Sequence, residues 1–213
     1  MRRARVLVLI SGGGSNLQTL IDAARQPNCA YEIVHVIANR PDAFGLKRAE
    51  HAGIASACLD HKAFQVRADF DTALAALIDQ ITPDLIVLAG FMRIMGAEFV
   101  ARYEGRMINI HPSLLPNFPG LHTHARALEA GVTLHGCTVH WVTAGVDEGA
   151  IIGQACVPVL PGDSPDDLAA RVLVQEHRLY PVCVEAVASG RARLVNGRTY
   201  LDGKPGGIAL MGI

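Results

Sequence analysis

The chain has 213 residues, of which 50% are apolar and 18% are charged, so it can bury a substantial core. Its formal net charge of -1 argues against nucleic acid or an anionic membrane surface as a partner, because no general electrostatic attraction would draw it to either. The five cysteines are odd in number, widely spaced and free of any C-x-x-C pair, which is typical of a reducing cytoplasm rather than of a disulfide framework.

The first apolar run, residues 6–10, is shorter than the roughly 7–15 residues of a signal-peptide core, and we interpret it as a buried strand. The chain also lacks an uncharged apolar run of the ~20 residues that cross a bilayer, so we expect a soluble protein.

Predicted strands and helices alternate through the first half of the chain. The strands are apolar on both faces, and the helices repeat apolar residues at helical spacing. The expected strands are 5–10, 31–38, 54–59 and 84–90, and the expected helices follow the glycine loop and cover 43–52 and 64–80. This alternation predicts an open, mostly parallel, Rossmann-like α/β sheet with helices on both faces.

A short helix at 96–102 and a strand at 107–110 lead into the proline-rich segment HPSLLPNFPG, residues 111–120. Each proline restricts the backbone, so this loop should follow a defined path. Open α/β proteins bind ligands in loops at the carboxyl ends of strands. Towards the C-terminus, segments 133–142 and 150–159 are expected to form antiparallel or edge strands.

The last part of the chain opens with a helix signal at Ser164, which is followed by a proline and, three residues on, by an acid. We expect this helix to run to about residue 188. Residues 194–201 predict a hairpin that turns at Asn196 and Gly197. The glycine-rich tail that follows is expected to be poorly ordered.

The glycine loop SGGGSN, residues 11–16, joins the first predicted strand to the first helix. Backbone N–H groups of Gly14, Ser15 and Asn16 can therefore point at an anion held at the helix N-terminus. The dinucleotide fingerprint is only half met, since Leu17 stands where the third glycine should be, and the lysine of a P-loop is missing. The loop favours a phosphate monoester; the alternative is a tight turn that needs glycine for backbone reasons.

Asn109 and His111 flank Ile110 at the end of a predicted strand, so alternation places both polar side chains on one face. An amide donor beside an imidazole suits an acyl-transfer oxyanion and proton transfer. Asp147, in the glycine-flanked stretch 144–149, could contact His111 and stabilise its imidazolium near neutral pH. The alternatives are a structural hydrogen bond for His111 and a cap or turn role for Asp147.

Histidines are frequent in this part of the chain, at His122, His124, His135 and His140, but none has a partner at the spacing of a zinc site, so we expect no metal. Glu176 lies on or beside the apolar stripe of the long helix. A carboxylate bordering an apolar face needs a cationic or hydroxyl partner, such as a ribose or an amine, and a salt bridge to an arginine is the alternative.

Several independent motifs, in the right order, resemble the 10-formyltetrahydrofolate-dependent formyltransferase family. They are Asn109 followed by HPSLLPNFPG, GCTVHWVTAGVDEGAII at 136–152, and also ISGGGSNLQ, DAFGLKRA, LAGFMRIM, GLHTHARALE and QEHRLYP. Over about residues 5–190, the likeness is to single-domain members that act on glycinamide ribonucleotide. The resemblance implies a cytoplasmic enzyme of purine biosynthesis, which transfers the formyl group of 10-formyltetrahydrofolate to the amine of glycinamide ribonucleotide without a metal.

The resemblance also implies a role for individual residues. The catalytic trio would be Asn109, His111 and Asp147. The ribonucleotide would be held at its phosphate and ribose by Gly14, Ser15, Asn16 and Glu176. The folate would be held by Arg67, Met92, Arg93, Ile94, Met95, Asn109, Thr143 and Asp147. Two positions depart from the family pattern: Gly13, often asparagine or a bulkier residue, and Leu173, where some members carry a polar or basic residue near the phosphate.

We therefore expect a single formyltransferase domain over residues 1–213. It would comprise a glycine-loop, nucleotide-binding half at about 1–105, a folate-binding and catalytic half at about 106–190, and a C-terminal hairpin and tail at 191–213. Its partners would be the two small-molecule substrates, with the oligomeric state open and a homodimer as one option. The rival is a 10-formyltetrahydrofolate hydrolase, which could use the same trio with water as acceptor. A transfer RNA formyltransferase would need an additional nucleic-acid-binding domain, and a nucleotide-binding dehydrogenase or binding module would leave the trio unexplained.

Overall fold

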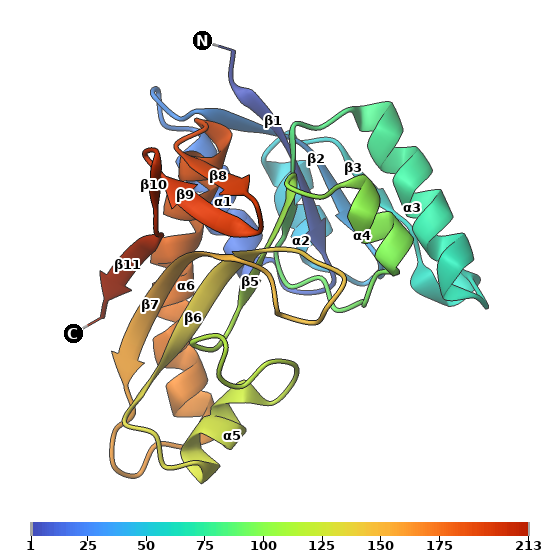
Figure 1. The fold of residues 1–213 in the computed structure, drawn as a ribbon. Coiled ribbons are helices and arrows are strands. Elements are labelled where there is room, and N and C mark those ends of the chain that lie inside the picture. The colour runs from blue at the N-terminus through green and yellow to red at the C-terminus, as the bar shows by residue number, and fades with distance from the viewer. Residues whose placement is uncertain (1, 213) are drawn as a thin grey trace. The chain divides into compact units, whose positions relative to one another are not determined.

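The computed structural model describes residues 2–212, and the chain divides into two compact units, Met1–Ile108 and Asn109–Ile213. Figure 1 shows the course of the chain and the labels of its elements. Within the described residues, no helix has the length and apolar character needed to cross a membrane.

Four parallel strands form the framework of the first unit, in the order β4-β1-β2-β3. Their bounds are β1 Ala4–Ile10, β2 Tyr31–Ala38, β3 Ser56–Cys58 and β4 Leu85–Leu88. Strand β1 pairs with β2 on one side and with β4 on the other, and its residues 6–10 are fully buried. A strand covered on both faces has to be apolar throughout, which explains the unbroken apolar run in the sequence.

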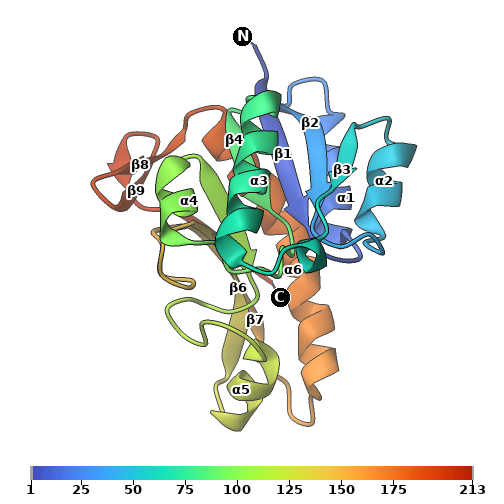
Figure 2. The same cartoon turned by 90° about the vertical axis from the view of Figure 1, so that its right-hand side faces the viewer.

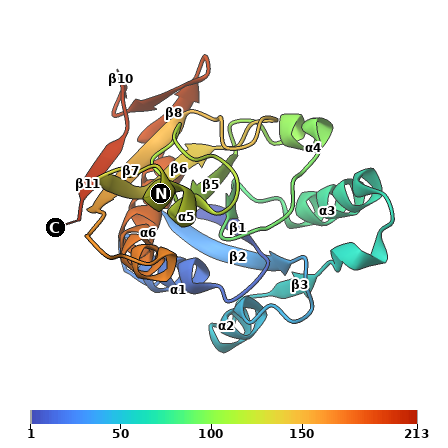
Figure 3. The same ribbon diagram turned by 90° about the horizontal axis from the view of Figure 1, so that it is seen from below.

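The helices of the first unit lie on both faces of these strands, α1 and α2 on one face and α3 with α4 on the other (Figures 2 and 3). Their bounds are α1 Ser15–Ala24, α2 Gly45–His51, α3 Arg67–Ile81 and α4 Ala97–Arg102, with a 3-10 turn at His61–Ala63. Helix α3 begins three residues later than predicted, because Phe64 is extended (φ -115°) after the 3-10 turn. The predicted parallel sheet with helices on both faces is confirmed.

The second unit opens with the last three residues of β5 (Met107–His111). Strands β6 (Leu134–Trp141) and β7 (Ile151–Pro158) are antiparallel, as predicted. Helix α6 (Pro165–Ala188) packs against both of them, and α5 (Thr123–Glu129), which the sequence pattern did not predict, lies beside α6.

A hairpin and the tail complete the second unit. Strands β8 (Ala192–Val195), β9 (Arg198–Leu201) and β10 (Lys204–Pro205) form a small antiparallel sheet, with the turn at residues 196–197 as predicted. The expectation of a poorly ordered tail is wrong for residues 204–211, because β11 (Ile208–Met211) pairs in parallel with β7. A strand at the edge of a sheet has unpaired backbone N–H and C=O groups. Pairing with these groups of β7 fixes the tail segment, although its glycines are typical of a flexible chain end.

Helix α6 starts with the predicted capping box. The Ser164 side chain accepts from the N–H of Asp167 (3.2 Å), and the Asp167 carboxylate accepts from the N–H of Ser164 (3.0 Å). These bonds satisfy backbone donors that a helix start leaves without partners. They define the start of the helix that carries Glu176.

Candidate active site

The glycine loop of the first unit ends at Gly14, the N-cap of α1, in a left-handed conformation (φ 69°). A Cβ atom on Gly14 would lie 2.8 Å from the Cα of Gly45, so a side chain is excluded both by the backbone angle and by space. The Gly13 carbonyl accepts a hydrogen bond from Arg48 Nε at 2.8 Å. The loop thus turns a carbonyl towards α2, and α1 begins at Ser15 with the positive end of its dipole, where an anion is favoured.

Arg48 is a neighbour of this loop that the sequence analysis missed. It also donates to the Gln18 side chain (3.2 Å) and stacks on the Phe44 ring at 5.1 Å. The pairing brings a cation to the loop from 35 positions away in the chain, a separation that hides it from local patterns. A Cβ atom on Gly13 would meet nothing within 4 Å, so the structure does not require glycine at this departure from the family pattern.

The predicted folate-binding segment, residues 92–95, is held at both ends by side chains of the first unit. Ser11 Oγ accepts from the N–H of Met92 (2.8 Å), and Asp71 Oδ2 accepts from the N–H of Gly96 (2.7 Å). Both acceptors are buried. The sequence analysis did not identify either one, because neither belongs to the segment that it holds.

This anchored segment presents large apolar side chains to solvent, with Met92 70% and Ile94 62% exposed. Exposed apolar side chains on a fixed backbone are typical of a ligand-binding surface. Between them, the Arg93 guanidinium stacks on the Phe70 ring at 4.4 Å, while Met95 is buried. Arg67, the first residue of α3, is exposed.

The second unit brings two members of the predicted trio together. His111, at the end of β5, is buried, and its Nδ1 lies 3.3 Å from Asp147 Oδ2. Asp147 belongs to the connection between β6 and β7, so the contact depends on how β5 and β6 are placed in the sheet. The contact with His111 is observed, and so is the alternative turn position, since Asp147 lies in a turn with a left-handed backbone (φ 57°).

His140 is the cluster member that the sequence analysis considered only as a metal ligand. Its Nε2 lies 3.2 Å from Asn109 Nδ2 and 3.6 Å from Asp147 Oδ1. The Asn109 amide therefore bonds to His140, a contact that the sequence analysis did not anticipate. His140 Nδ1 lies 2.9 Å from the Trp141 carbonyl, which can only accept, so this nitrogen carries the proton and Nε2 accepts from Asn109.

Asp147 remains ionised near neutral pH. Burial raises the pKa of this carboxyl, but the neighbouring His140 ring, the hydrogen bond from the N–H of Gly120 (2.9 Å) and the charge of His111 together more than offset it, and the pKa lies below its ordinary value. The carboxylate thus accepts from one backbone N–H and has two imidazole rings beside it.

The second ring nitrogen of His111, Nε2, lies 3.0 Å from the carbonyl of Phe118. Both nitrogens of the ring thus face oxygen acceptors. Only the protonated ring can donate to both at once.

The proline-rich loop follows a defined path, as predicted. The Leu115 N–H donates to Thr138 Oγ1 (3.0 Å), and the Thr138 hydroxyl donates to the Ser113 carbonyl (2.6 Å). Gln154 Nε2 donates to the Leu115 carbonyl (2.8 Å). Side chains of β6 and β7 therefore hold the loop that follows His111.

Glu176 is buried on α6, 8% exposed, and Leu173, one turn earlier, is 37% exposed. Thr143 is half-buried at the start of the connection that carries Asp147.

His135 occupies a core position, fully buried against the rings of Phe118 (5.9 Å) and His124 (5.2 Å).

Over residues 2–212, the His, Cys, Asp and Glu side chains form no group of three that could hold a metal ion.

An α/β fold with a half-buried carboxylate between two imidazoles, beside an amide, suits an enzyme that transfers an acyl group such as formyl. The family model described as formyl transferase matches residues 4–184, and the chain belongs to that family.

Its relatives include the phosphoribosylglycinamide formyltransferase of Escherichia coli K12, 50% identical over 199 residues, which are 93% of this chain and 94% of that protein. The enzyme of that name from Haemophilus influenzae is 46% identical over 200 residues, 94% of each chain. The solved structure of the Coxiella burnetii enzyme has a TM-score of 0.93 at 49% identity and covers 98% of this chain and 100% of its own.

Proposed function

We propose that this formyltransferase moves the formyl group of 10-formyltetrahydrofolate to the amine of glycinamide ribonucleotide and forms formylglycinamide ribonucleotide in purine biosynthesis. The names of its relatives support this substrate pair. The observation that carries the proposal is the Asp147 carboxylate, 3.3 Å from one imidazole and 3.6 Å from a second. Such a cluster suits acid-base assistance to acyl transfer.

In the proposed mechanism, the amine of the ribonucleotide attacks the formyl carbon, and the formyl oxygen becomes an oxyanion. Asn109 Nδ2 and the protonated ring of His111 donate hydrogen bonds to it, and one such donor contributes on the order of 3 kcal/mol. For Nε2 of His111 to reach this oxygen, the ring has to exchange its bond to the Phe118 carbonyl for the substrate.

A proton must then leave the attacking nitrogen and reach N10 of the folate, so that the bond from carbon to N10 breaks and tetrahydrofolate departs. We propose that a water molecule held by the Asp147 carboxylate relays this proton. His140 would orient the Asn109 amide through the hydrogen bond between them. These steps need no metal ion.

The glycine loop is the proposed phosphate site, with Gly14, Ser15 and Asn16 as its backbone donors and Arg48 as a nearby cation. Glu176, a buried carboxylate on α6, would accept hydrogen bonds from the ribose hydroxyls. Leu173 adds no charge to help hold the phosphate.

The folate would contact the backbone of the 92–95 segment, whose ends Ser11 and Asp71 hold. We propose that Met92, Arg93, Ile94 and Met95 line the pterin site with Thr143, Asp147 and Asn109, and that Arg67 and its exposed guanidinium attract the anionic tail of the folate.

All five cysteines are free thiols, which supports a reducing cytoplasm as the location.

The deciding experiment follows the release of tetrahydrofolate from 10-formyltetrahydrofolate by the purified protein, with and without glycinamide ribonucleotide. We expect rapid release only with the ribonucleotide, because a bound amine is aligned with the formyl carbon, whereas water is neither anchored nor as nucleophilic. Mass spectrometry should identify formylglycinamide ribonucleotide as the product. Equally fast release of formate without the ribonucleotide would instead make the protein a hydrolase.

A further inference from the structure

Trp141, the last residue of β6, is tied to the C-terminal hairpin by a buried hydrogen bond. Its indole Nε1 donates to Thr199 Oγ1 at 3.1 Å across 58 positions of the chain, and the two residues are only 2% and 7% exposed. An indole N–H in such a place needs an acceptor, because an unpaired buried donor is costly. Thr199 supplies that acceptor.

The backbone of Trp141 forms the base of the segment that carries Asp147. Its N–H donates to the Ala150 carbonyl (3.0 Å), which closes the connection between β6 and β7. Its carbonyl accepts from His140 Nδ1 (2.9 Å), the bond that sets the tautomer of this ring. The position of Trp141 therefore bears on both His140 and Asp147.

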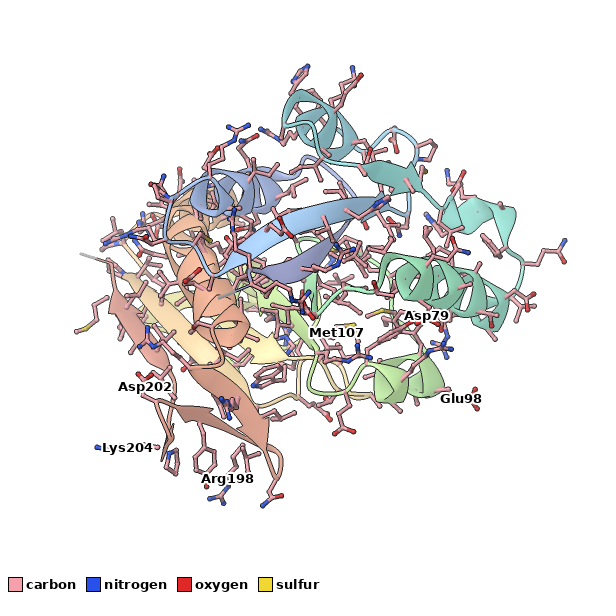
Figure 4. All side chains as sticks on the ribbon, turned by 90° about the horizontal axis from the view of Figure 1, so that it is seen from above. Asp79, Glu98, Met107, Arg198, Asp202 and Lys204 are labelled. Carbon is pink, nitrogen blue, oxygen red and sulfur yellow. The ribbon has the colours of Figure 1, made fainter. Side chains whose placement is uncertain are left out.

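Thr199 is held in turn by the hairpin and the tail. It lies buried between exposed Arg198 and half-buried Tyr200 on β9, and the Arg198 side chain projects outward from the small sheet in Figure 4. The Thr199 carbonyl accepts from the N–H of Gly206 (3.1 Å). Thr199 and Asp147 also line the same cavity of about 910 Å³, so the hairpin borders the catalytic segment directly.

We propose that Thr199 is a positioning residue of the formyl transfer site and acts through Trp141 on His140 and Asp147. Its hydroxyl fixes the indole, and the indole fixes the backbone from which the acid-base groups project. The C-terminal hairpin is then part of the catalytic apparatus and more than a cover of the sheet. This inference rests on the proposed function.

The test compares Thr199→Val, which removes the hydroxyl at nearly constant volume, with Thr199→Ser, which keeps it. We expect the valine variant to lower kcat roughly tenfold with both KM values nearly unchanged, since small displacements of catalytic groups reduce rate more than affinity. The serine variant should retain most of the activity. Thr133→Val, the same exchange at an exposed residue just before β6, is the matched control and should behave as wild type.

Two further measurements do not depend on valine being tolerated. Trp141→Phe removes the donor, and it should reproduce the loss of kcat without adding to that of Thr199→Val in the double variant. In the ligand-free protein, the 15N shifts of His140 should show a proton on Nδ1 in the wild type and the serine variant, and a mixed tautomer in the valine variant.

The proposal is overturned if Thr199→Val keeps more than half of kcat, if Thr199→Ser loses as much as valine, or if the His140 tautomer is unaffected. The tautomer measurement uses no substrate, so its result stands apart from the proposed reaction. A wild-type protein that fails to formylate glycinamide ribonucleotide contradicts the proposed function instead.

Discussion

At the scale of single residues, Asp147 is the residue around which the other groups of the site are arranged. Its backbone is left-handed (φ 57°), a conformation that aspartate tolerates better than most side chains. Its carboxylate accepts a hydrogen bond from the N–H of Gly120 and faces His111 and His140. Strain of this kind persists where surrounding contacts hold it, and it is common in active sites.

We predict that Asp147→Asn lowers kcat by about 10²–10⁴, the range for losing acid-base assistance, with little change in either KM. The amide keeps the size of the side chain but lacks the negative charge that faces His111. Steady-state kinetics with each substrate varied in turn measure the effect. A folded variant with more than half of the wild-type kcat would remove Asp147 from the mechanism.

At the scale of elements, the connection 142–150 depends on Gly149 for its closure. The residue is buried, and a Cβ atom there would lie 1.6 Å from the Trp141 carbonyl oxygen. That oxygen also accepts from His140. A side chain at Gly149 therefore has to displace either the β6 backbone or the segment that carries Asp147.

Gly149→Ala should lower the free energy of unfolding by about 1–3 kcal/mol, the usual cost of overpacking, and kcat by at least about tenfold through displacement of Asp147. Urea denaturation and initial rates measure the two effects. Gly162→Ala is the control: a Cβ there meets nothing within 4 Å, and only the left-handed backbone (φ 86°) adds a cost of about 1–2 kcal/mol. Equal activity of both variants would show that the connection tolerates a side chain at Gly149.

At the scale of the whole molecule, a buried histidine links stability to pH. Burial, with the nearby charges of His124 and His111, lowers the pKa of His135 to about 4. In the unfolded chain the ring has its ordinary pKa of about 6.5. Between these values the unfolded chain binds the additional proton, so stability is lost as the pH falls from about 6.5 towards 4.

We expect this loss to be on the order of 2 kcal/mol, and His135→Leu should abolish most of it. Urea denaturation at pH 7, 5.5 and 4.5 compares the wild type with His135→Leu and with a control at exposed His51, His51→Gln. The control should keep the wild-type dependence on pH. The same dependence in all three proteins would mean that another group unfolds the protein in acid.

Much of the fold could be predicted because its signals are local. Residues 6–10 are apolar at every position, as expected for a strand that is buried on both faces. Ser164 and Asp167 lie within one helical turn, and Asn196 and Gly197 are adjacent. The tail was predicted wrongly because its strand forms only by pairing with β7, about fifty positions away.

The residues of the candidate site also fall into those that a local sequence pattern identifies and those that only contacts between distant parts of the chain reveal. Asn109 and His111 are two positions apart on one strand, and this alternation singled them out. His140 went unrecognised because its bond to Asn109 spans 31 positions and depends on which residues of β6 lie beside β5. Arg48, Ser11 and Asp71 likewise act on segments remote from them in sequence.

The sequence by itself therefore determined the strands as far as residue 201, the long helix, the glycine loop and the residue types suited to formyl transfer, because apolar period, turn chemistry and capping operate within a few residues. Only the tertiary structure decided that Asp147 lies between two imidazoles and that Thr199 supports Trp141 from a distance of 58 positions. Such contacts follow from strand pairing and close packing, which bring together side chains whose separation along the chain carries no periodic signal.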